Sequence, residues 1–447
     1  MEISSLFLAR VQFALSLNVH VLFAALAMAL GWILCVFRFR AWRAPDSGWM
    51  LAYRFWVRVF ALSFFLALAT ALPVLIEFGT LWPNLIERTG NLAGPLLAFS
   101  LTTFFVTKSV FMGVVLFGQR RVSSKAHFFA VLMVAVGTTL TIFWALVLHT
   151  WAQAPMGGGL IAGRYQVYEW NEVILTPFVF WRGVGFLAGA FLLTGLLMLG
   201  VTAWQALRRP LDDGERVSYR TGLVVSLCAV LLYWAALDGN ARMVAQYQPA
   251  VAAAQVGYWD SAASPEWVWL GTPNVTTRST SVLWLTKINA QRWLGKQAEA
   301  SLLGLDAVSD EGLPPVAAMF WLLRAALLAG LLASALLLVT LFAAARQGLE
   351  PAQQPKWLLR TQVWASGLGV CAWLITWNLA DLGRSPYLVA GTLLQQDAVV
   401  EAGPVAMAWV LASALACYVL LLIGFGEMLW RAARFGVVPV RKPGMPL

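Results

Sequence analysis

Long apolar blocks separated by short polar segments set the pattern along this chain. The blocks lie at about 7–36, 55–80, 93–118, 127–151, 175–204, 217–237, 316–345, 358–381 and 405–430. Each is long enough to cross a hydrocarbon core of about 30 Å as an α-helix. The pattern therefore predicts an all-α polytopic membrane protein with about nine transmembrane helices arranged in bundles.

One long polar segment, 238–315, interrupts this pattern between the sixth and seventh helices. It is rich in charged residues and proline and shows no clear helical period. Loops of that length more often bind a ligand or partner than merely connect helices. We therefore divide the chain into helices one to six (1–237), an outer loop segment (238–315), and helices seven to nine with a cytoplasmic tail (316–447).

Composition supports a membrane protein, because 60% of the residues are hydrophobic, only 12% are charged, and the mean hydropathy is +0.73. Most of the 31 Lys and Arg residues lie in the loops after helices one, three, five and seven and in the C-terminal tail. The positive-inside rule makes these regions cytoplasmic and places the N-terminus and the 238–315 loop outside. The net charge of +10 then reflects topology and attraction to the lipid bilayer, and it calls for no nucleic-acid partner.

His20 is the most informative single residue, because it lies inside the first apolar block. An ionisable side chain is costly in a membrane, so a role as ligand or proton relay is its default explanation. The four cysteines are isolated within apolar blocks, without CxxC or CxxCH spacing. They indicate no zinc site, disulfide framework or c-type haem attachment.

Five short motifs follow one another along nearly the whole chain. They are RVQFAL at 10–15 with His20, GTLW at 79–82, WALV at 144–147 with WAQAP at 151–155, VAQYQPA at 244–250, and GRSPY at 383–387. Together with the nine-helix topology and the long outer loop, they make the chain similar to subunit I of the cytochrome bd-type quinol oxidases.

The resemblance implies electron transport in a respiratory chain of the bacterial or archaeal cytoplasmic (inner) membrane. Subunit I of that family holds three haems, takes electrons from quinol at the outer loop and reduces dioxygen to water. It is paired with a second polytopic membrane protein, subunit II. A subunit II-like protein, and further respiratory subunits, are therefore the expected partners.

Only part of the family's haem ligand set is present here. His20 matches the axial ligand of a high-spin haem. Gly185 stands where the low-spin haem has its histidine, and Ala326 stands where that haem has its methionine. Neither residue offers a lone pair to iron. The resemblance therefore predicts that the low-spin haem is absent or bound by other residues.

Three carboxylate positions of the family are also changed. Phe99 stands at the first, Thr107 or Lys108 at the second, and Phe425 at the third. Glu427 is two residues away from the third position and points to a different helix face. These replacements predict that the haem cavity is filled by bulky side chains.

The quinol-binding pair of the outer loop is replaced as well. Val251 and Val256 stand where quinol-oxidising members carry a lysine and a glutamate. Valine can neither pair with a quinol hydroxyl nor accept its proton. The resemblance therefore implies no standard quinol site.

Other polar residues are candidates to compensate. His149, near the outer end of the fourth helix, is either a second haem ligand or a hydrogen-bonding partner of a neighbouring helix. Arg10 and Arg384 are candidate anchors for a haem propionate or for helix interfaces, because a guanidinium forks onto a carboxylate.

Two functional hypotheses follow from this pattern. In one, the chain is a divergent redox-active subunit that keeps at least one haem, a high-spin haem b or d on His20, and receives electrons from a donor other than quinol in its outer loop. In the other, it is a haem-poor or haem-free structural or assembly subunit of a larger respiratory membrane complex. An unrelated transporter has little support beyond the charges inside the membrane.

Overall fold

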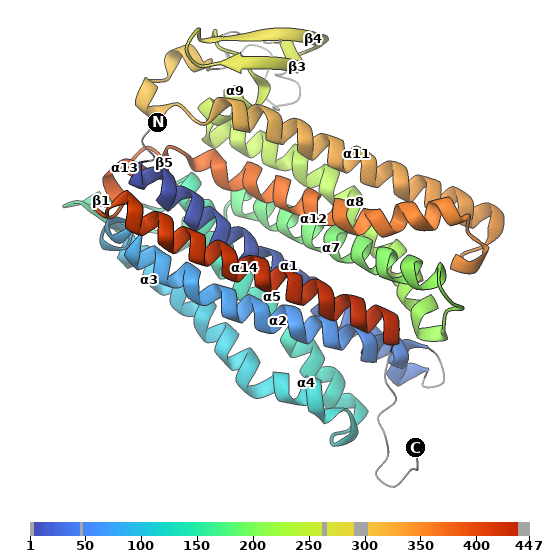
Figure 1. Cartoon of the computed structure of the whole chain (residues 1–447). Helices are drawn as coiled ribbons and strands as arrows, with labels where there is room; N and C mark the ends of the chain where they lie inside the picture. The colour runs from blue at the N-terminus through green and yellow to red at the C-terminus, as the bar shows by residue number, and fades with distance from the viewer. Residues whose placement is uncertain (1–3, 45–47, 262–265, 290–302, 437–447) are drawn as a thin grey trace.

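Long helical spans form the body of the molecule (Figure 1). The structure is a computed structural model that describes residues 4–44, 48–261, 266–289 and 303–436. Within these residues, nine helical segments are long and apolar enough to cross a membrane. The predicted all-α fold is therefore confirmed.

The spans coincide with the apolar blocks and extend beyond most of them. They are α1 (Ser5–Arg43), α2 (Trp49–Thr80), α3 (Pro83–Val106) continued by η1 (Thr107–Met112), α4 (Gly113–Phe117) and η2 (Gly118–Arg120), α5 (Ser124–Gln153), α6 (Trp170–Ile174) with α7 (Pro177–Ala206), α8 (Asp213–Tyr247), α11 (Val316–Gln347), α12 (Lys356–Asp381) with η6 (Leu382–Arg384), and α14 (Pro404–Phe435).

Local sequence explains where several spans begin. Ser4 and Ser123 accept hydrogen bonds from backbone amides in the first turns of α1 and α5. Thr176 does the same for α7, whose first residue is a proline. Asp212 and Glu215 form a reciprocal capping box at the start of α8. Each cap satisfies backbone N–H groups that a helix start leaves unpaired.

The helices α1 and α7 are the most buried spans, whereas α3 and α14 lie at the edge and bury the smallest share of their most apolar windows. The core of the bundle comes from α1 packed against α2 and α5, and from α7 packed against α8 and α12. Ala135 and Gly137 of α5 allow close approach: a Cβ on Gly137 would lie 1.8 Å from Oγ1 of Thr107. That contact is made at η1, where the third span is wound as a π-helix.

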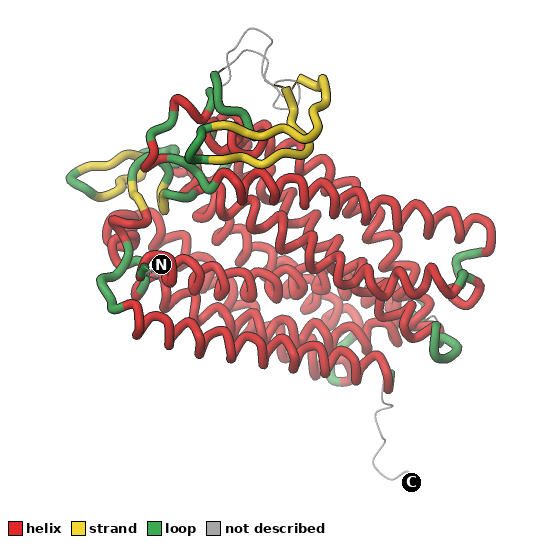
Figure 2. The backbone as a smooth tube through the Cα atoms, turned by 45° about the horizontal axis from the view of Figure 1, so that its top comes forward, coloured by secondary structure: helices red, strands yellow, loops and turns green. Residues whose placement is uncertain are grey.

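Strands and short helices gather at one end of the bundle (Figure 2). The antiparallel pairs are β1 (Gly158–Ile161) with β2 (Arg164–Val167), β3 (Glu266–Asn274) with β4 (Ser279–Asn289), and β5 (Tyr387–Val389) with β6 (Leu393–Leu394). The short helices at this end are α9 (Pro249–Val256), α13 (Gln395–Ala398), η3 (Leu305–Ala307) and η4 (Asp310–Gly312). This is the end that the charge pattern assigns to the outside.

The segment between the sixth and seventh spans is partly helical. The sixth span continues to Tyr247, ten residues beyond the end of its apolar block, and α9 follows at once. The β3–β4 hairpin then lies over α9 and α11 (Figure 1). The seventh span begins at Val316, as the apolar pattern predicts.

Candidate functional site

His20 is held by one ring nitrogen and keeps the other available. Its Nδ1 lies 3.1 Å from the carbonyl oxygen of Ala67 and 3.3 Å from Oγ1 of Thr70, both on α2. A carbonyl can only accept, so we assign the proton to Nδ1. Nε2 then carries a lone pair and makes no hydrogen bond within the described residues. Histidines that bind metals are commonly oriented in this way by their second nitrogen.

A cavity of about 430 Å³ lies beside His20, between α1, α2, α3, α5 and α12. Its volume is in the range of organic ligand and cofactor sites. The lining is largely apolar, with Ser100, Thr138 and Thr141 among its few hydroxyls. His149 and Arg384 also line it. The cavity therefore fits an apolar group with a charged edge, which is the chemical character of a haem.

The prediction that bulky side chains fill this cavity is wrong beside His20. Phe99 is 54% exposed and packs on Trp144, with ring centroids 5.1 Å apart, instead of lining the cavity. Phe425 packs edge-on against Phe23, at a centroid separation of 5.2 Å. Both rings take the place of a carboxylate in the sequence without entering the space beside His20.

His149 bonds to a neighbouring helix through one nitrogen only. Its Nε2 lies 3.1 Å from Oδ1 of Asp381 on α12, and its ring stacks on Trp377 at a centroid distance of 4.9 Å. If Nε2–H donates to the carboxylate, Nδ1 carries the lone pair. That Nδ1 is buried and has no hydrogen-bond partner. His149 is therefore compatible with both interpretations: Nε2 pairs with α12, and Nδ1 is available as a haem ligand.

Asp381 joins His149 to a buried group of cations. Nη2 of Arg384 lies 3.1 Å from the same Oδ1. Arg182 donates from Nη2 to Oε1 of Gln153 at 2.6 Å, and its Nε is buried without a partner. The group thus holds two guanidinium ions and one carboxylate, all largely buried. This excess of positive charge suits a further anionic group, such as a second carboxylate.

The two candidate arginine anchors lie in different surroundings. Arg384 is buried, pairs with Asp381 and lines the large cavity, with its guanidinium 5.9 Å from the ring centre of Phe13. Arg10 is exposed on α1 and does not line that cavity. The structure therefore brings His20, His149 and Arg384 to one cavity and leaves Arg10 outside it.

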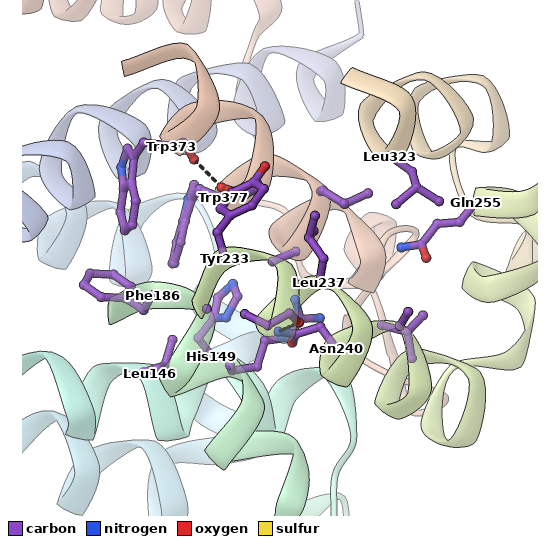
Figure 3. A pocket seen from close by; sticks show the side chains of 18 residues that line it. Leu146, His149, Phe186, Tyr233, Leu237, Asn240, Gln255, Leu323, Trp373 and Trp377 are labelled. Carbon is purple, nitrogen blue, oxygen red and sulfur yellow. Dashed lines mark hydrogen bonds between the residues drawn. The ribbon is translucent and has the colours of Figure 1, made fainter. Parts of the chain in front are cut away.

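The position of the family's low-spin haem ligand opens onto a much smaller cavity, of about 90 Å³ (Figure 3). Gly185 lines it, and a Cβ on Gly185 would lie 3.2 Å from Nδ2 of Asn240. Phe186, Trp373 and Trp377 pack on its other side, with Phe186 and Trp373 centroids 4.8 Å apart. This volume is about one-fifth of that of the cavity beside His20. The residues present do not fit a haem here.

Ala326, which stands at the position of the low-spin haem's methionine ligand, is also tightly packed. Ala326 is fully buried, and its carbonyl accepts a 2.9 Å hydrogen bond from the hydroxyl of Tyr233. No side-chain atom at this position can reach an iron. Within the described residues, moreover, no group of three or more His, Cys, Asp or Glu side chains is placed to hold a metal ion.

The outer loop buries the positions of the quinol pair. Val251 and Val256 are 6% and 1% exposed in α9, whose side chains belong to an apolar core cluster with α11. Neither valine has a polar atom to offer a ligand. Gln248, in the adjoining motif, donates to the carbonyl of Gly383 at 3.1 Å.

Arg324 fixes this loop to the bundle. Its guanidinium donates to the carbonyl oxygens of Gln255 and Val256 of α9, Val268 and Trp269 of β3, and Phe320 of its own helix. This role of Arg324 was not predicted from the sequence. The available signal was an arginine inside an apolar helix with no acidic residue one turn away.

Comparisons with known proteins identify the family to which this fold belongs. The family model described as "Cytochrome bd terminal oxidase subunit I" matches residues 8–437. "Cytochrome bd ubiquinol oxidase subunit 1" of Bacillus subtilis (strain 168) is 24% identical over 407 residues, which cover 89% of this chain and 86% of that protein. "Cytochrome bd-II ubiquinol oxidase subunit 1" of Escherichia coli (strain K12) is 28% identical over 265 residues, covering 58% and 51%.

A solved structure is similar over almost the whole fold. The bd oxidase from Geobacillus thermodenitrificans matches with a TM-score of 0.86 and 19% sequence identity, covering 96% of this chain and 98% of that chain. At this identity the likeness establishes the fold.

Proposed function

Since the chain belongs to the cytochrome bd terminal oxidase subunit I family, we propose that it is a divergent, haem-poor subunit of a bd-type oxidase complex. In this proposal it binds one high-spin haem b or d through His20 and has neither a low-spin haem nor a standard quinol site. Nε2 of His20 would hold the haem iron, and the carbonyl of Ala67 on α2 orients the His20 ring through Nδ1.

The observation that carries this proposal is the free Nε2 of His20 beside a 430 Å³ cavity. A haem bound there would supply a redox-active iron for electron transfer and dioxygen binding. The chain's own residues orient the ligand and exclude water, because the lining is mostly apolar. Arg384 and His149 on the same cavity are the candidate partners for the haem's carboxylates, and Nδ1 of His149 remains a candidate ligand.

Electrons would reach this haem from a donor other than quinol bound in the outer loop. The Val251 and Val256 positions are buried and apolar, and the Gly185 position opens onto a cavity too small for a haem. A subunit II-like membrane protein, or a further respiratory subunit, is the proposed source. We propose a bacterial or archaeal inner membrane as the location, with the N-terminus outside and the C-terminus cytoplasmic, from the distribution of Lys and Arg.

The second candidate function is a haem-free structural or assembly subunit of a respiratory complex. It is favoured by the tight packing around Gly185 and Ala326, and by the hydrogen bonds through which Arg324 fixes the outer loop to the bundle. Under this alternative, His20 is only a helix-pairing residue that binds Ala67 and Thr70.

The test is a reduced-minus-oxidised visible spectrum of the intact complex from host membranes, with haem extraction to count cofactors. We expect one high-spin haem that is assigned to this chain by its loss in His20→Ala. The matched control is His127→Gln, at a histidine that does not line the cavity. A haem content unchanged by His20→Ala would refute the redox proposal and support the structural alternative.

A further inference from the structure

Lys108 places a cation deep within the third span. It lies in the π-helical segment η1, in an apolar stretch that runs from Leu92 to Phe117. Arg120, the first charged residue toward the helix end, is twelve positions away, which corresponds to about 18 Å along a helix. A lysine side chain reaches only roughly 6 Å, so its ammonium cannot snorkel to that end.

No group in the described part of the chain compensates this charge. Within the described residues, Lys108 makes no ion pair and no side-chain hydrogen bond, and it does not line the large cavity, although Phe104 and Phe105 do. Its neighbour Thr107 faces inward and packs on Gly137 of α5. An intramembrane ammonium normally pairs with a carboxylate, a carbonyl or water.

Two further polar side chains of the same helix are exposed on the surface of the bundle. Thr102 and Ser109 are exposed and make no side-chain hydrogen bond within the part of the chain described. They are seven residues apart, about two helical turns, and therefore lie on similar faces. The span as a whole is at one edge of the bundle, and only 22% of its most apolar window is buried (Figure 1). Lipid acyl chains offer these groups no partner.

We infer that Thr102, Lys108 and Ser109 form a docking surface for a transmembrane helix of a partner subunit, and that this helix carries an Asp or Glu at mid-membrane depth that pairs with Lys108. The inference rests on the proposal that the chain is a subunit of a larger complex. An anionic lipid is disfavoured because its phosphate lies at the membrane surface, beyond the reach of Lys108. A second copy of the chain would instead bring two lysines together.

The experiment is zero-length crosslinking of the intact complex in lipid nanodiscs with a membrane-permeant carbodiimide, followed by peptide mass spectrometry. This reagent joins an amine to a carboxylate that touches it. We expect a crosslink between Lys108 and an Asp or Glu in a transmembrane segment of a different chain. A crosslink to a second copy of this chain, a lipid adduct, or no crosslink at Lys108 would overturn the inference.

Substitution provides an independent readout. Lys108→Met should fold, because methionine is favoured in the membrane, but should lower recovery of the partner about tenfold or more. Lys108→Arg should retain the partner. Lys125→Met is the matched control, since Lys125 is exposed at the start of α5 and its loss should leave recovery unchanged. Full recovery with Lys108→Met would contradict the inference. Haem content measured on the same preparations reports separately on the proposed function.

Discussion

Oδ1 of Asp381 lies 3.1 Å from Nε2 of His149 and 3.1 Å from Nη2 of Arg384, so a single carboxylate oxygen joins α5 to the C-terminal end of α12. Both side chains beside it are about nine-tenths buried. Arg182 is a second buried guanidinium near this carboxylate. Asp381 is therefore the electrostatic centre of this buried cluster.

Removing this carboxylate should destabilise the fold strongly. Asp381→Asn keeps the side-chain shape but leaves two buried guanidinium ions without a counter-charge. The expected loss is about 3–5 kcal/mol of unfolding free energy, as for other broken buried pairs. Thermal unfolding of the purified complex, followed by tryptophan fluorescence, measures it. The control Asp213→Asn breaks an exposed pair with Arg216 and should cost less than about 1 kcal/mol. Equal effects of the two variants would show that Asp381 is not the electrostatic centre of the cluster.

Restoring the family's low-spin ligands should not restore a low-spin haem. The double variant Gly185→His and Ala326→Met supplies both ligand types, but the cavity there holds only about 90 Å³. The new histidine would also meet the side chain of Asn240, which is held by the carbonyls of Trp181 and Ala236. We expect lower yield and no additional haem per complex.

Haem extraction and the visible spectrum test this expectation. A new low-spin band in the double variant would mean that the surrounding aromatic side chains can move aside. The variant Gly185→Ala is a useful reference, because it adds only the Cβ that lies 3.2 Å from Asn240. It should reduce stability less than the histidine does, since the volume that must be accommodated is smaller.

A carboxylate at Val256 should destabilise the outer loop without creating quinol oxidation. Val256 is 1% exposed in the core formed by α9 and α11, and an unpaired charge placed there loses its hydration. The expected cost is several kcal/mol, seen as a lower unfolding temperature. Val275→Glu introduces the same charge at a 47% exposed position of the β3–β4 turn and should change stability by less than about 0.5 kcal/mol. Quinol-dependent oxygen uptake that appears only with Val256→Glu would contradict our account of this loop.

Much of the fold could be predicted because membrane spans have a strong local signal. Each apolar block is long enough to cross the bilayer, and the nine spans follow from that alone. His20 could also be recognised from the sequence as a candidate ligand, because it lies in an apolar run. The hydrogen bond between His149 and Asp381 could not be predicted, since it joins residues 232 positions apart and depends on how α5 meets α12. The size of the space beside His20 depends on side-chain directions as well, which is why the replacement at Phe99 was misleading.

The outer loop should lose its attachment when Arg324 is replaced by lysine. The five carbonyl acceptors around Arg324 belong to three elements, α9, β3 and α11, and a planar guanidinium can bond to several of them at once. A lysine ammonium has three donors on one atom, so at least two carbonyls lose a charged partner. The expected destabilisation is roughly 3 kcal/mol or more, at about 1.5–3 kcal/mol for each such bond.

Hydrogen–deuterium exchange locates this effect. In Arg324→Lys we expect faster amide exchange in peptides that cover α9 and β3, while α7 keeps its wild-type exchange, because the lost bonds hold only the outer loop. Arg346→Lys is the matched control on the same helix: Arg346 is exposed and lies 4.3 Å from the ring centre of Phe342. It should leave the loop's exchange unchanged. If α9 and β3 exchange equally slowly in both variants, the loop is held by the apolar packing of α9 on α11 and not by Arg324.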